Sequence, residues 1–307
     1  MLSKKQKLLI KKSISLFSVV RGYNIPILVL AQYLSAIFIL APEKAPLDVV
    51  LDFQLFVLIL ASSLTVASGY IINNFYDSKK DLINRPTKSY IDRLVSQQTK
   101  LQVYFGLNFM VALLAFLVSF RAVLYFSAYI FGIWFYSHKI KRYAILGNMM
   151  AALLAVLPFF AVFLYYKNFY EVIIFHALFL YILLLVRELV KDLENITGDL
   201  ANDYHTIAIA YGAQTSKLVI AGLLVLTILP VYFLISVYDV GYMDAYFYFG
   251  FLLMLFFLQK LWTAQTKRDF LLLHNLLKFL IVAGVFCIVL INPSVLGKGL
   301  AGLQRLI

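Results

Sequence analysis

The chain has 307 residues, of which 63% are hydrophobic and only 14% are charged. Soluble domains carry about 25% charged residues, so this composition excludes an ordinary soluble enzyme and indicates a protein that crosses the membrane several times. The net charge of +12 could suggest nucleic acid as a partner. In so apolar a chain we attribute it instead to loops that set the topology and contact anionic lipid, and we expect no nucleic-acid partner.

The two ends of the chain are expected to lie outside the membrane. Residues 1–20 begin with a basic stretch, and no short apolar segment with a cleavage site follows it, so we interpret them as a retained cytosolic leader. Residues 21–295 are predicted to form a single transmembrane domain, and residues 296–307 a short C-terminal tail. The single cysteine, Cys287, excludes a disulfide framework and is expected to be a small core hydrophobe.

Apolar stretches of about 20 residues, long enough to cross about 30 Å of hydrocarbon, recur along the whole chain. They predict an all-α bundle of nine transmembrane helices, because backbone groups in lipid must be satisfied within each segment. The predicted helices cover residues 24–41, 52–75, 101–119, 121–138, 145–166, 171–190, 214–238, 242–263 and 275–295. With the N-terminus inside, most of the 27 lysines and arginines fall on the cytosolic side, which places the N-terminus in the cytosol and the C-terminus outside.

Two polar segments follow the second and sixth predicted helices, on the same side of the membrane. The first, motif 1, reads NNFYDSKKDLINRP, and its Asn73, Asp77 and Asp81 have the spacing i, i+4, i+8, which forms one stripe on a helix. Carboxylates at a helix C-terminus face partial negative charge, which disfavours them by about 0.3–1 kcal/mol. A compensating cation is therefore expected beside them.

The second polar segment, motif 2, reads RELVKDLENITGD. Its Glu188, Asp192 and Asn195 have the spacing i, i+4, i+7, and Asp199 follows four residues later. Mg²⁺ suits such oxygen-rich sites, since it is commonly held by one or two carboxylates together with substrate phosphates. Either motif alone is also typical of solvated acids at a membrane edge. The two motifs on one side of the membrane favour a metal site.

Basic and polar side chains on the same side are candidates for binding an anion. They end the fourth predicted helix or open the first: Tyr136, Lys139, Lys141, Arg142, Arg21 and Asn24. Their alternative role is to set the topology.

Other common sites have no support in the sequence. The four histidines are scattered and lack a cysteine partner, which excludes a zinc site, and no Walker or G-x-G-x-x-G sequence occurs.

Motif 1 resembles the N-D-x-x-D-x-x-x-D sequence of the UbiA superfamily of intramembrane prenyltransferases, and Asn84-Arg85-Pro86 is similar to the N-R-P that usually follows it. Asn74 stands where the family usually has Asp. Motif 2 is similar to the family's K-D-x-x-D-x-x-x-D from Lys191 onward, with Asn195 in place of an acid. The stretch YSHKIKR followed by Gly-Asn, and Arg-x-x-Asn near the start, resemble two further signatures. The resemblance covers about residues 20–295.

The resemblance implies a helical bundle around a central cavity, with the two motifs facing each other and two Mg²⁺ ions bridging them to a prenyl diphosphate. The implied catalytic and metal-binding residues are Asn73, Asp77, Asp81, Asp192, Asn195 and Asp199. The implied substrate-binding residues are Arg21, Asn24, Asn74, Arg85, Tyr136, Lys139, Lys141, Arg142, Glu188 and Lys191. The partners implied are a prenyl diphosphate, a lipophilic acceptor and membrane lipid.

In motif detail, RELVKDLENITGD and the later TIAIAYG look most like the branch that transfers geranylgeranyl to geranylgeranylglycerol phosphate for ether lipid. Prenylation of an aromatic quinone precursor, of the 4-hydroxybenzoate or naphthoate type, is the alternative within the superfamily. A membrane transporter is the alternative outside it, although transporters more often place polar residues near the midplane on broken helices. A CDP-alcohol phosphotransferase would need a D-G…A-R segment before its Asp pair, and none occurs.

Overall fold

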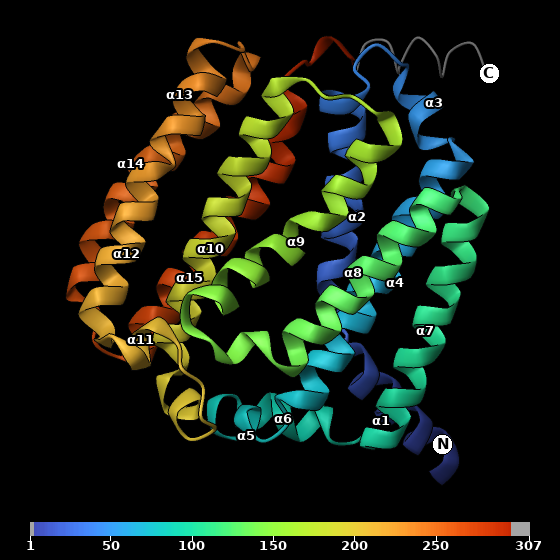
Figure 1. Cartoon of the computed structure of the whole chain (residues 1–307), viewed down its shortest axis with the longest axis vertical. Helices are drawn as coiled ribbons and strands as arrows, with labels where there is room; N and C mark the ends of the chain where they lie inside the picture. Colours follow the sequence, from blue (N-terminus) through green and yellow to red (C-terminus); the bar gives the residue numbers. More distant parts are fainter. Residues whose placement is uncertain (1–2, 296–307) are drawn as a thin grey trace.

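The structure, a computed structural model, describes residues 3–295, and every element in this part of the chain is helical (Figure 1). The predicted C-terminal tail, 296–307, lies outside the described residues. In chain order the elements are α1 (Lys4–Val19), η1 (Gly22–Asn24), α2 (Ile25–Ser35), η2 (Ala36–Leu40), α3 (Pro46–Val50), α4 (Phe53–Tyr76), α5 (Lys80–Asn84), α6 (Pro86–Asp92), α7 (Gln97–Val118), α8 (Phe120–His138), η3 (Ile140–Arg142), α9 (Ala144–Tyr166), α10 (Glu171–Leu200), α11 (Ile207–Ala210), α12 (Gly212–Leu226), α13 (Ile228–Ser236), η4 (Gly241–Met243), α14 (Asp244–Thr263), α15 (Lys267–Cys287) and η5 (Ile288–Leu290).

Eight helical segments are long and apolar enough to cross a membrane, which confirms the polytopic membrane fold. They are Gly22–Leu40, Phe53–Tyr76, Gln97–Val118, Ala144–Tyr166, Glu171–Leu200, Gly212–Ser236, Gly241–Thr263 and Lys267–Leu290. The predicted span 121–138 corresponds to α8, which packs against α4, α7 and α9. It is not among these eight segments, and its sequence contains Arg121 and several Tyr and Ser residues. The count of nine spans therefore stays a prediction.

The tyrosines of α8 have a packing role beside a proline in α9. Pro158 has no N–H, so the carbonyl of Leu154, one turn earlier, lacks its usual helical donor. The hydroxyl of Tyr129 donates to that carbonyl at 2.8 Å. On the other side, Gln32 Nε2 of α2 donates to the carbonyl of Pro158 at 2.8 Å. The Leu154 carbonyl that the proline leaves open is thus satisfied inside the bundle, as a lipid environment demands, and Gln32 adds a contact between α2 and α9.

Two helices are longer than the sequence predicts. Helix α10 continues ten residues past the predicted end at 190, so motif 2 is itself helical. Helix α15 begins at Lys267 rather than near residue 275. A capping box fixes this start, because Thr266 Oγ1 accepts from the N–H of Asp269 and Asp269 Oδ2 accepts from the N–H of Thr266 at 2.8 Å. Hydropathy alone ended α10 too early and started α15 too late, because the turns of both helices at the motif end are polar.

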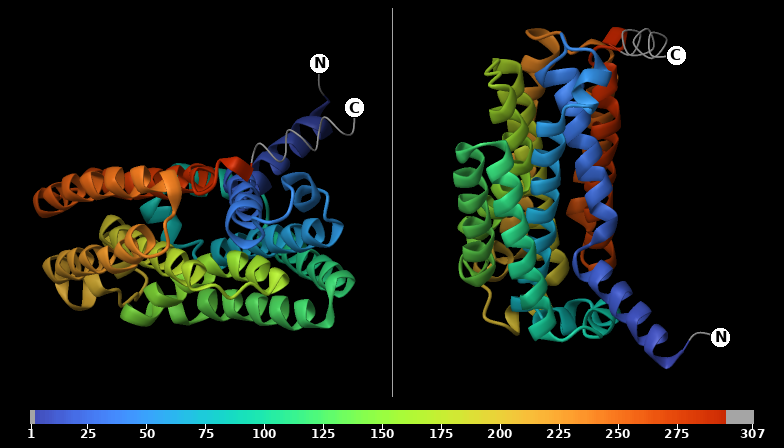
Figure 2. Two further views of the ribbon diagram at one scale, coloured as in Figure 1. Left: turned by 90° about the horizontal axis from the view of Figure 1, so that it is seen from above. Right: turned by 90° about the vertical axis from the view of Figure 1, so that its right-hand side faces the viewer.

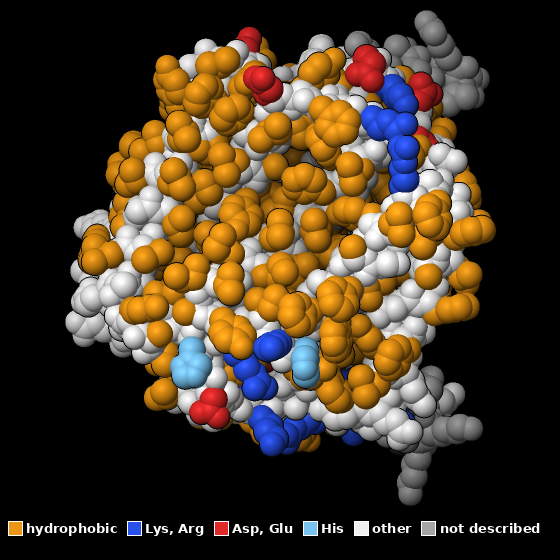
Figure 3. Space-filling view, viewed as in Figure 1, with side chains coloured by type: hydrophobic (Ala, Val, Ile, Leu, Met, Phe, Trp, Pro, Cys, Tyr) orange, Lys and Arg blue, Asp and Glu red, His pale blue; other side chains and the backbone are white. Residues whose placement is uncertain are grey.

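Among the described residues, the buried hydrophobic side chains form two main cores, and a small further cluster joins α9 to α10. The first core is built mainly from α2, α4, α7, α8 and α9, and the second from α10 to α15. Motif 1 ends α4 in the first core, and motif 2 ends α10 in the second. Both motifs lie at one end of the bundle with α5, α6 and α11, as the sequence predicts, and α1 extends away from that end (Figures 1 and 2). Figure 3 shows an apolar surface across the middle of one face, with charged side chains near its two ends.

Candidate active site

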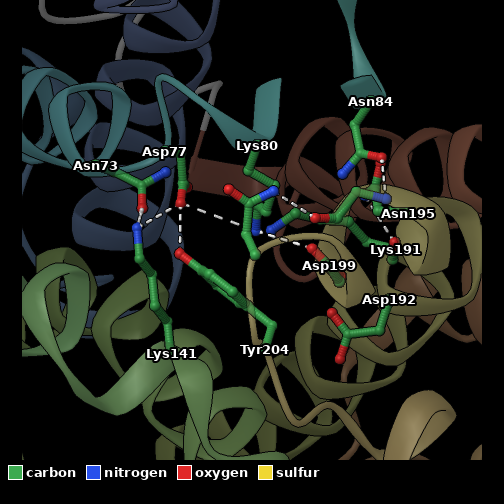
Figure 4. A network of polar contacts seen from close by, with 12 residues as sticks. Asn73, Asp77, Lys80, Asn84, Lys141, Lys191, Asp192, Asn195, Asp199 and Tyr204 are labelled. Carbon is green, nitrogen blue, oxygen red and sulfur yellow. Dashed lines mark hydrogen bonds and ion pairs between the residues drawn. The ribbon is translucent and has the colours of Figure 1, made fainter. Parts of the chain in front are cut away.

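Motif 1 closes α4 and continues into α5. Asp77 is the C-cap of α4, and Asn73 lies one turn before it on the same face. Lys141 of η3 points at both, with its Nζ 2.6 Å from Asp77 Oδ1 and 3.3 Å from Asn73 Oδ1. The hydroxyl of Tyr204, from the loop after α10, donates to the same Asp77 oxygen at 2.8 Å (Figure 4). Three elements distant in sequence therefore converge on one carboxylate.

Lys80 connects the two motifs. Its Nζ lies 3.1 Å from Asp199 Oδ1 of motif 2 and 3.8 Å from Asp77 Oδ1 of motif 1. The same ammonium group lies 4.1 Å from the centroid of the Tyr204 ring. The two acidic motifs are held together here by a lysine that both share.

A glycine allows α5 to approach α10 closely. The N–H of Gly198 donates to Asn84 Oδ1 at 3.1 Å, and both groups are buried. A methyl group at position 198 would overlap the Asn84 amide. A side chain larger than a hydrogen atom would therefore not fit at position 198. The glycine lets the N-R-P segment lie directly against α10.

The remaining polar residues of motif 2 have separate partners. Asp192 Oδ2 accepts a hydrogen bond from Asn148 Nδ2 of α9 at 2.7 Å. Asn195 Nδ2 donates to the backbone carbonyl of Lys191 at 2.7 Å, one turn earlier. Glu188 pairs with cations of its own helix, since Lys191 Nζ lies 2.6 Å from its Oε2. Glu188 is thus compensated within its own helix, whereas Asp199 is paired with Lys80 of motif 1.

Burial and charge act on the ionisable groups of motif 1 in opposite directions. Burial by itself would raise the pKa of Asp77, but the Lys141 and Lys80 ammonium groups, with hydrogen bonds from Lys141 and Tyr204, hold that pKa well below its usual range. Burial together with the charge of Asp77 raises the pKa of Asp81. Asp77 is therefore a stable anion, and the carboxylate of Asp81 would gain from a further cation.

A small cavity of about 60 Å³ lies between the motifs. Five of the side chains that line it are basic and two are carboxylates, so its lining favours an anion once the carboxylates are paired. The lining residues are Arg21, Asn73, Asp77, Lys80, Asp81, Asn84, Arg85, Tyr136, Lys141, Lys191, Asn195 and Tyr204. We call this the motif pocket.

A second, larger cavity of about 740 Å³ adjoins the motif pocket. Four residues line both: Arg21, Asn84, Arg85 and Lys191. Most of the larger cavity is lined by apolar side chains of α2, α9, α10 and α15. A ligand with an anionic head and a long apolar tail could place its head in the motif pocket and its tail in this apolar chamber.

The oxygen atoms at the motif pocket suit Mg²⁺. Within residues 3–295, no three His, Cys, Asp or Glu side chains converge closely enough to hold a metal by themselves. Amide oxygens and substrate phosphates complete such sites, and Asn195 Oδ1 is a buried acceptor with no hydrogen-bond donor. Asp199 Oδ1 also lacks a hydrogen bond and is neutralised only by the ion pair with Lys80. The Asn195 oxygen is available to a hard cation, whereas the Asp199 oxygen already faces the Lys80 ammonium group.

Sequence comparison identifies the family to which this arrangement corresponds. The sequence model of the UbiA prenyltransferase family matches residues 29–281. The chain belongs to this family. It is therefore a prenyltransferase enzyme, as its motifs predict, and an integral membrane protein.

Relatives of known name are similar over more than half of the chain. A digeranylgeranylglyceryl phosphate synthase of Methanobrevibacter smithii is 25% identical over 205 residues, which are 62% of this chain and 71% of the relative. A protein of the same name from Korarchaeum cryptofilum is 28% identical over 188 residues, 60% of this chain and 67% of the relative.

Solved structures share the UbiA fold. A structure from work on digeranylgeranylglyceryl phosphate synthase in membranes has a TM-score of 0.67 at 17% identity and covers 93% of this chain and 98% of that chain. A UbiA homologue from Archaeoglobus fulgidus, bound to DMAPP and Mg²⁺, has a TM-score of 0.59 at 13% identity, with 94% and 98% covered. At these identities the likeness shows the fold.

The structure brings most of the predicted UbiA site residues together. Those that line the motif pocket are Arg21, Asn73, Asp77, Asp81, Arg85, Tyr136, Lys141, Lys191 and Asn195. Asp192 and Asp199 lie beside it, with the partners described above, and Asn24 lines the apolar chamber, where its Nδ2 lies 3.3 Å from the Tyr70 hydroxyl.

Four predicted residues lie elsewhere. Asn74 is outside both cavities, and its amide joins Asp92 and Lys100. Lys139 is exposed and lines neither cavity. The remaining two contact neighbours at the edge of the site: Arg142, 5.9 Å from the Tyr204 ring centroid, and Glu188, in its local ion pairs.

The sequence analysis missed Lys80, Asn84 and Tyr204 as site residues. Lys80 had a usable signal, since it lies one turn after Asp77 within motif 1. Asn84 was noticed only as part of N-R-P. Tyr204 gave no signal, because only the tertiary fold returns the loop after α10 to α4.

Proposed function

We propose that this UbiA-family enzyme transfers a geranylgeranyl group from its diphosphate to geranylgeranylglyceryl phosphate, in the synthesis of ether lipid. The observation that carries the proposal is the cationic motif pocket opening onto a long apolar chamber. The names of the relatives support the choice of acceptor. The alternative acceptor, an aromatic quinone precursor, has no specific support from the geometry.

Two Mg²⁺ ions are proposed at the motif pocket, one for each motif. The residues proposed to hold them are Asn73, Asp77, Asp81, Asp192, Asn195 and Asp199. When bound, Mg²⁺ supplies positive charge that offsets the negative charge developing on the diphosphate. The binding of DMAPP with Mg²⁺ by the Archaeoglobus fulgidus homologue supports a metal-dependent reaction here.

The chain's own cations are proposed to bind and stabilise the leaving diphosphate. Arg85 and Lys191 line both cavities, so they lie where a diphosphate head would meet its apolar tail. Positively charged side chains that are already in place stabilise developing negative charge without reorganisation. As the allylic C–O bond breaks and diphosphate leaves with the bonding electron pair, the acceptor oxygen forms a new C–O bond and its proton passes to the diphosphate or to solvent.

The apolar chamber is proposed to keep water away from the allylic carbon. Its walls are built from side chains such as Phe159, Phe163 and Leu184. A dry surrounding prevents hydrolysis of a carbocation-like centre. We also propose that the motif end of the bundle faces the cytoplasm, because most of the basic loops lie there.

Product identification tests the function. Purified full-length enzyme would be offered geranylgeranyl diphosphate with geranylgeranylglyceryl phosphate, 4-hydroxybenzoate or a naphthoate, and the products identified by mass spectrometry. We expect the digeranylgeranyl ether phosphate and released diphosphate. Prenylation of an aromatic acid alone would overturn the proposed acceptor but leave the prenyltransferase assignment intact.

A further inference from the structure

One face of α15 lines the apolar chamber and carries unusual charges for a membrane-spanning helix. The helix begins at Lys267, and His274 and Lys278 follow on the chamber side with a spacing of one turn. Farther along, Ile281 and Val285 continue the same lining. At 1.5 Å per residue, Lys278 lies about 16 Å along the helix axis from Lys267. It lies about one turn inside the span predicted from hydropathy, which begins at residue 275.

Most cations around the chamber have a carboxylate or carbonyl partner. Glu194 is the only carboxylate among the lining residues, and it is shared by Arg85, 3.7 Å away, and His274, 2.9 Å away. Lys191 and its neighbour Arg187 pair with Glu188. These ion pairs engage both Glu194 and Glu188, so neither carboxylate is left to neutralise a cation farther along α15.

Lys278 is different. Within residues 3–295, no carboxylate lies within ion-pair distance of its ammonium group, and its only polar contact is with the face of the Tyr23 ring, 5.2 Å from the centroid. An ionisable side chain inside a spanning helix is costly and commonly marks a ligand site. A charge that only set the topology would lie in a loop, so its position calls for an anionic partner.

The neighbours of Lys278 are suited to the same anion. Tyr23 lies in η1 between Arg21 and Asn24, and all three line the chamber. Arg21 stacks over the Tyr70 ring, 5.0 Å from its centroid, and has no carboxylate within ion-pair distance among the described residues. Arg21 also lines the motif pocket. The chamber therefore has a second cationic corner next to the first.

We propose that Lys278, assisted by Arg21, binds the phosphate of the acceptor and so selects a phosphomonoester lipid. This inference rests on the proposed function, in which the motif pocket is already occupied by the donor's diphosphate. The acceptor brings a second anionic head and a second long tail. Its head needs a cation outside the motif pocket that still borders the apolar chamber, and Lys278 meets both conditions.

The test compares Lys278→Met with wild type, using acceptors with and without the phosphate. For geranylgeranylglyceryl phosphate, KM should rise about 10- to 100-fold, the loss expected for one charge-assisted hydrogen bond. For geranylgeranylglycerol, which lacks the phosphate, the variant and wild type should have the same KM. The KM for geranylgeranyl diphosphate should change less than about threefold, whereas Lys278→Arg should keep most of the phosphate preference.

Lys260→Met is the matched control. Lys260 also lies over an aromatic ring, 5.7 Å from the centroid of Phe256, but it is exposed and lines neither cavity. An equal KM for the phosphate acceptor in Lys278→Met and Lys260→Met would overturn the inference. So would a larger rise in KM for the donor than for the acceptor.

A binding measurement separates failure of this inference from failure of the proposed function. Thermal stabilisation of the full chain in detergent would be recorded with geranylgeranylglyceryl phosphate and with its alcohol. If wild type turns over only aromatic acceptors but is stabilised by the phosphate lipid in a Lys278-dependent way, the anion site stands and the proposed acceptor fails. If the phosphate lipid and the alcohol stabilise wild type equally, the anion site is overturned.

Discussion

Lys80 Nζ lies 3.1 Å from Asp199 Oδ1, which joins the end of motif 1 to the end of motif 2 across the boundary between the two hydrophobic cores. Asp199 is almost fully buried, with a side-chain exposure of 3%. A buried carboxylate without a partner is costly. Lys80 therefore neutralises Asp199 and at the same time joins motif 1 to motif 2.

Replacing Lys80 by Met tests whether this lysine neutralises Asp199 in the absence of metal. Without metal, the variant should lose up to about 3 kcal/mol of stability, because Asp199 is left unpaired. Mg²⁺ with inorganic diphosphate should restore more of the melting temperature than it adds to wild type. Lys88→Met is the control, since Lys88 pairs with Asp92 outside both cavities. Equal responses of both variants to Mg²⁺ would contradict the proposed metal site.

Asn74→Asp should destabilise the protein without changing its metal dependence. Asn74 Nδ2 donates to Asp92 Oδ2 at 2.8 Å, and Asn74 Oδ1 accepts from Lys100 Nζ at 2.8 Å. An aspartate would lose the donor and place two carboxylates together, at a cost of about 1–3 kcal/mol. Thermal unfolding and a Mg²⁺ titration of activity measure the two effects. An unchanged melting temperature with a shifted Mg²⁺ optimum would show that position 74 serves the metal after all.

Gly198→Ala should disturb the contact between α5 and α10. The added methyl group would push the Asn84 side chain away and break the hydrogen bond that its Oδ1 accepts from the N–H of residue 198. Such overpacking costs about 1–3 kcal/mol. Activity should fall with the melting temperature while the helical content stays the same. Gly222→Ala, in α12, is the control because its methyl group meets no neighbour within 4 Å. Full activity in Gly198→Ala would argue against this close approach.

Tyr204→Phe should move the acidic limb of the pH–activity profile. The Tyr204 hydroxyl helps to hold the pKa of Asp77 below its usual range, so the ionised form persists as the pH falls. Losing that hydrogen bond raises the pKa of Asp77, so activity should decline at a higher pH than in wild type. The loss of one hydrogen bond to a charged group is worth about 1.5–3 kcal/mol. If the acidic limb did not move, the Tyr204 hydroxyl would not be lowering the pKa of Asp77, or the ionisation of Asp77 would not limit the rate.

Hydropathy predicted the positions of the membrane-spanning helices well, because a helix that crosses the hydrocarbon layer needs about 20 mostly apolar residues. It failed at the motif ends of α10 and α15, where tertiary packing and the Thr266 capping box extend the helices through polar sequence. Helical periodicity found Asn73 and Asp77 but not the different role of Asn74. Position 74 is one residue from Asn73, hence about 100° around the helix, and therefore on another face. Contacts between distant segments, such as Tyr204 with Asp77, depend on the fold and could not be read from spacing.

The most direct test of the central claim, a metal-dependent transfer at the joined motifs, is diphosphate release as a function of Mg²⁺. Wild type, Asp77→Asn and Asp192→Asn would each be assayed with geranylgeranyl diphosphate and acceptor, from excess EDTA to millimolar Mg²⁺. We predict no release by wild type in EDTA, release that rises with Mg²⁺, and a loss of at least about 100-fold in each variant at every Mg²⁺ concentration. Release by wild type in excess EDTA, or full release by both variants, would contradict the account.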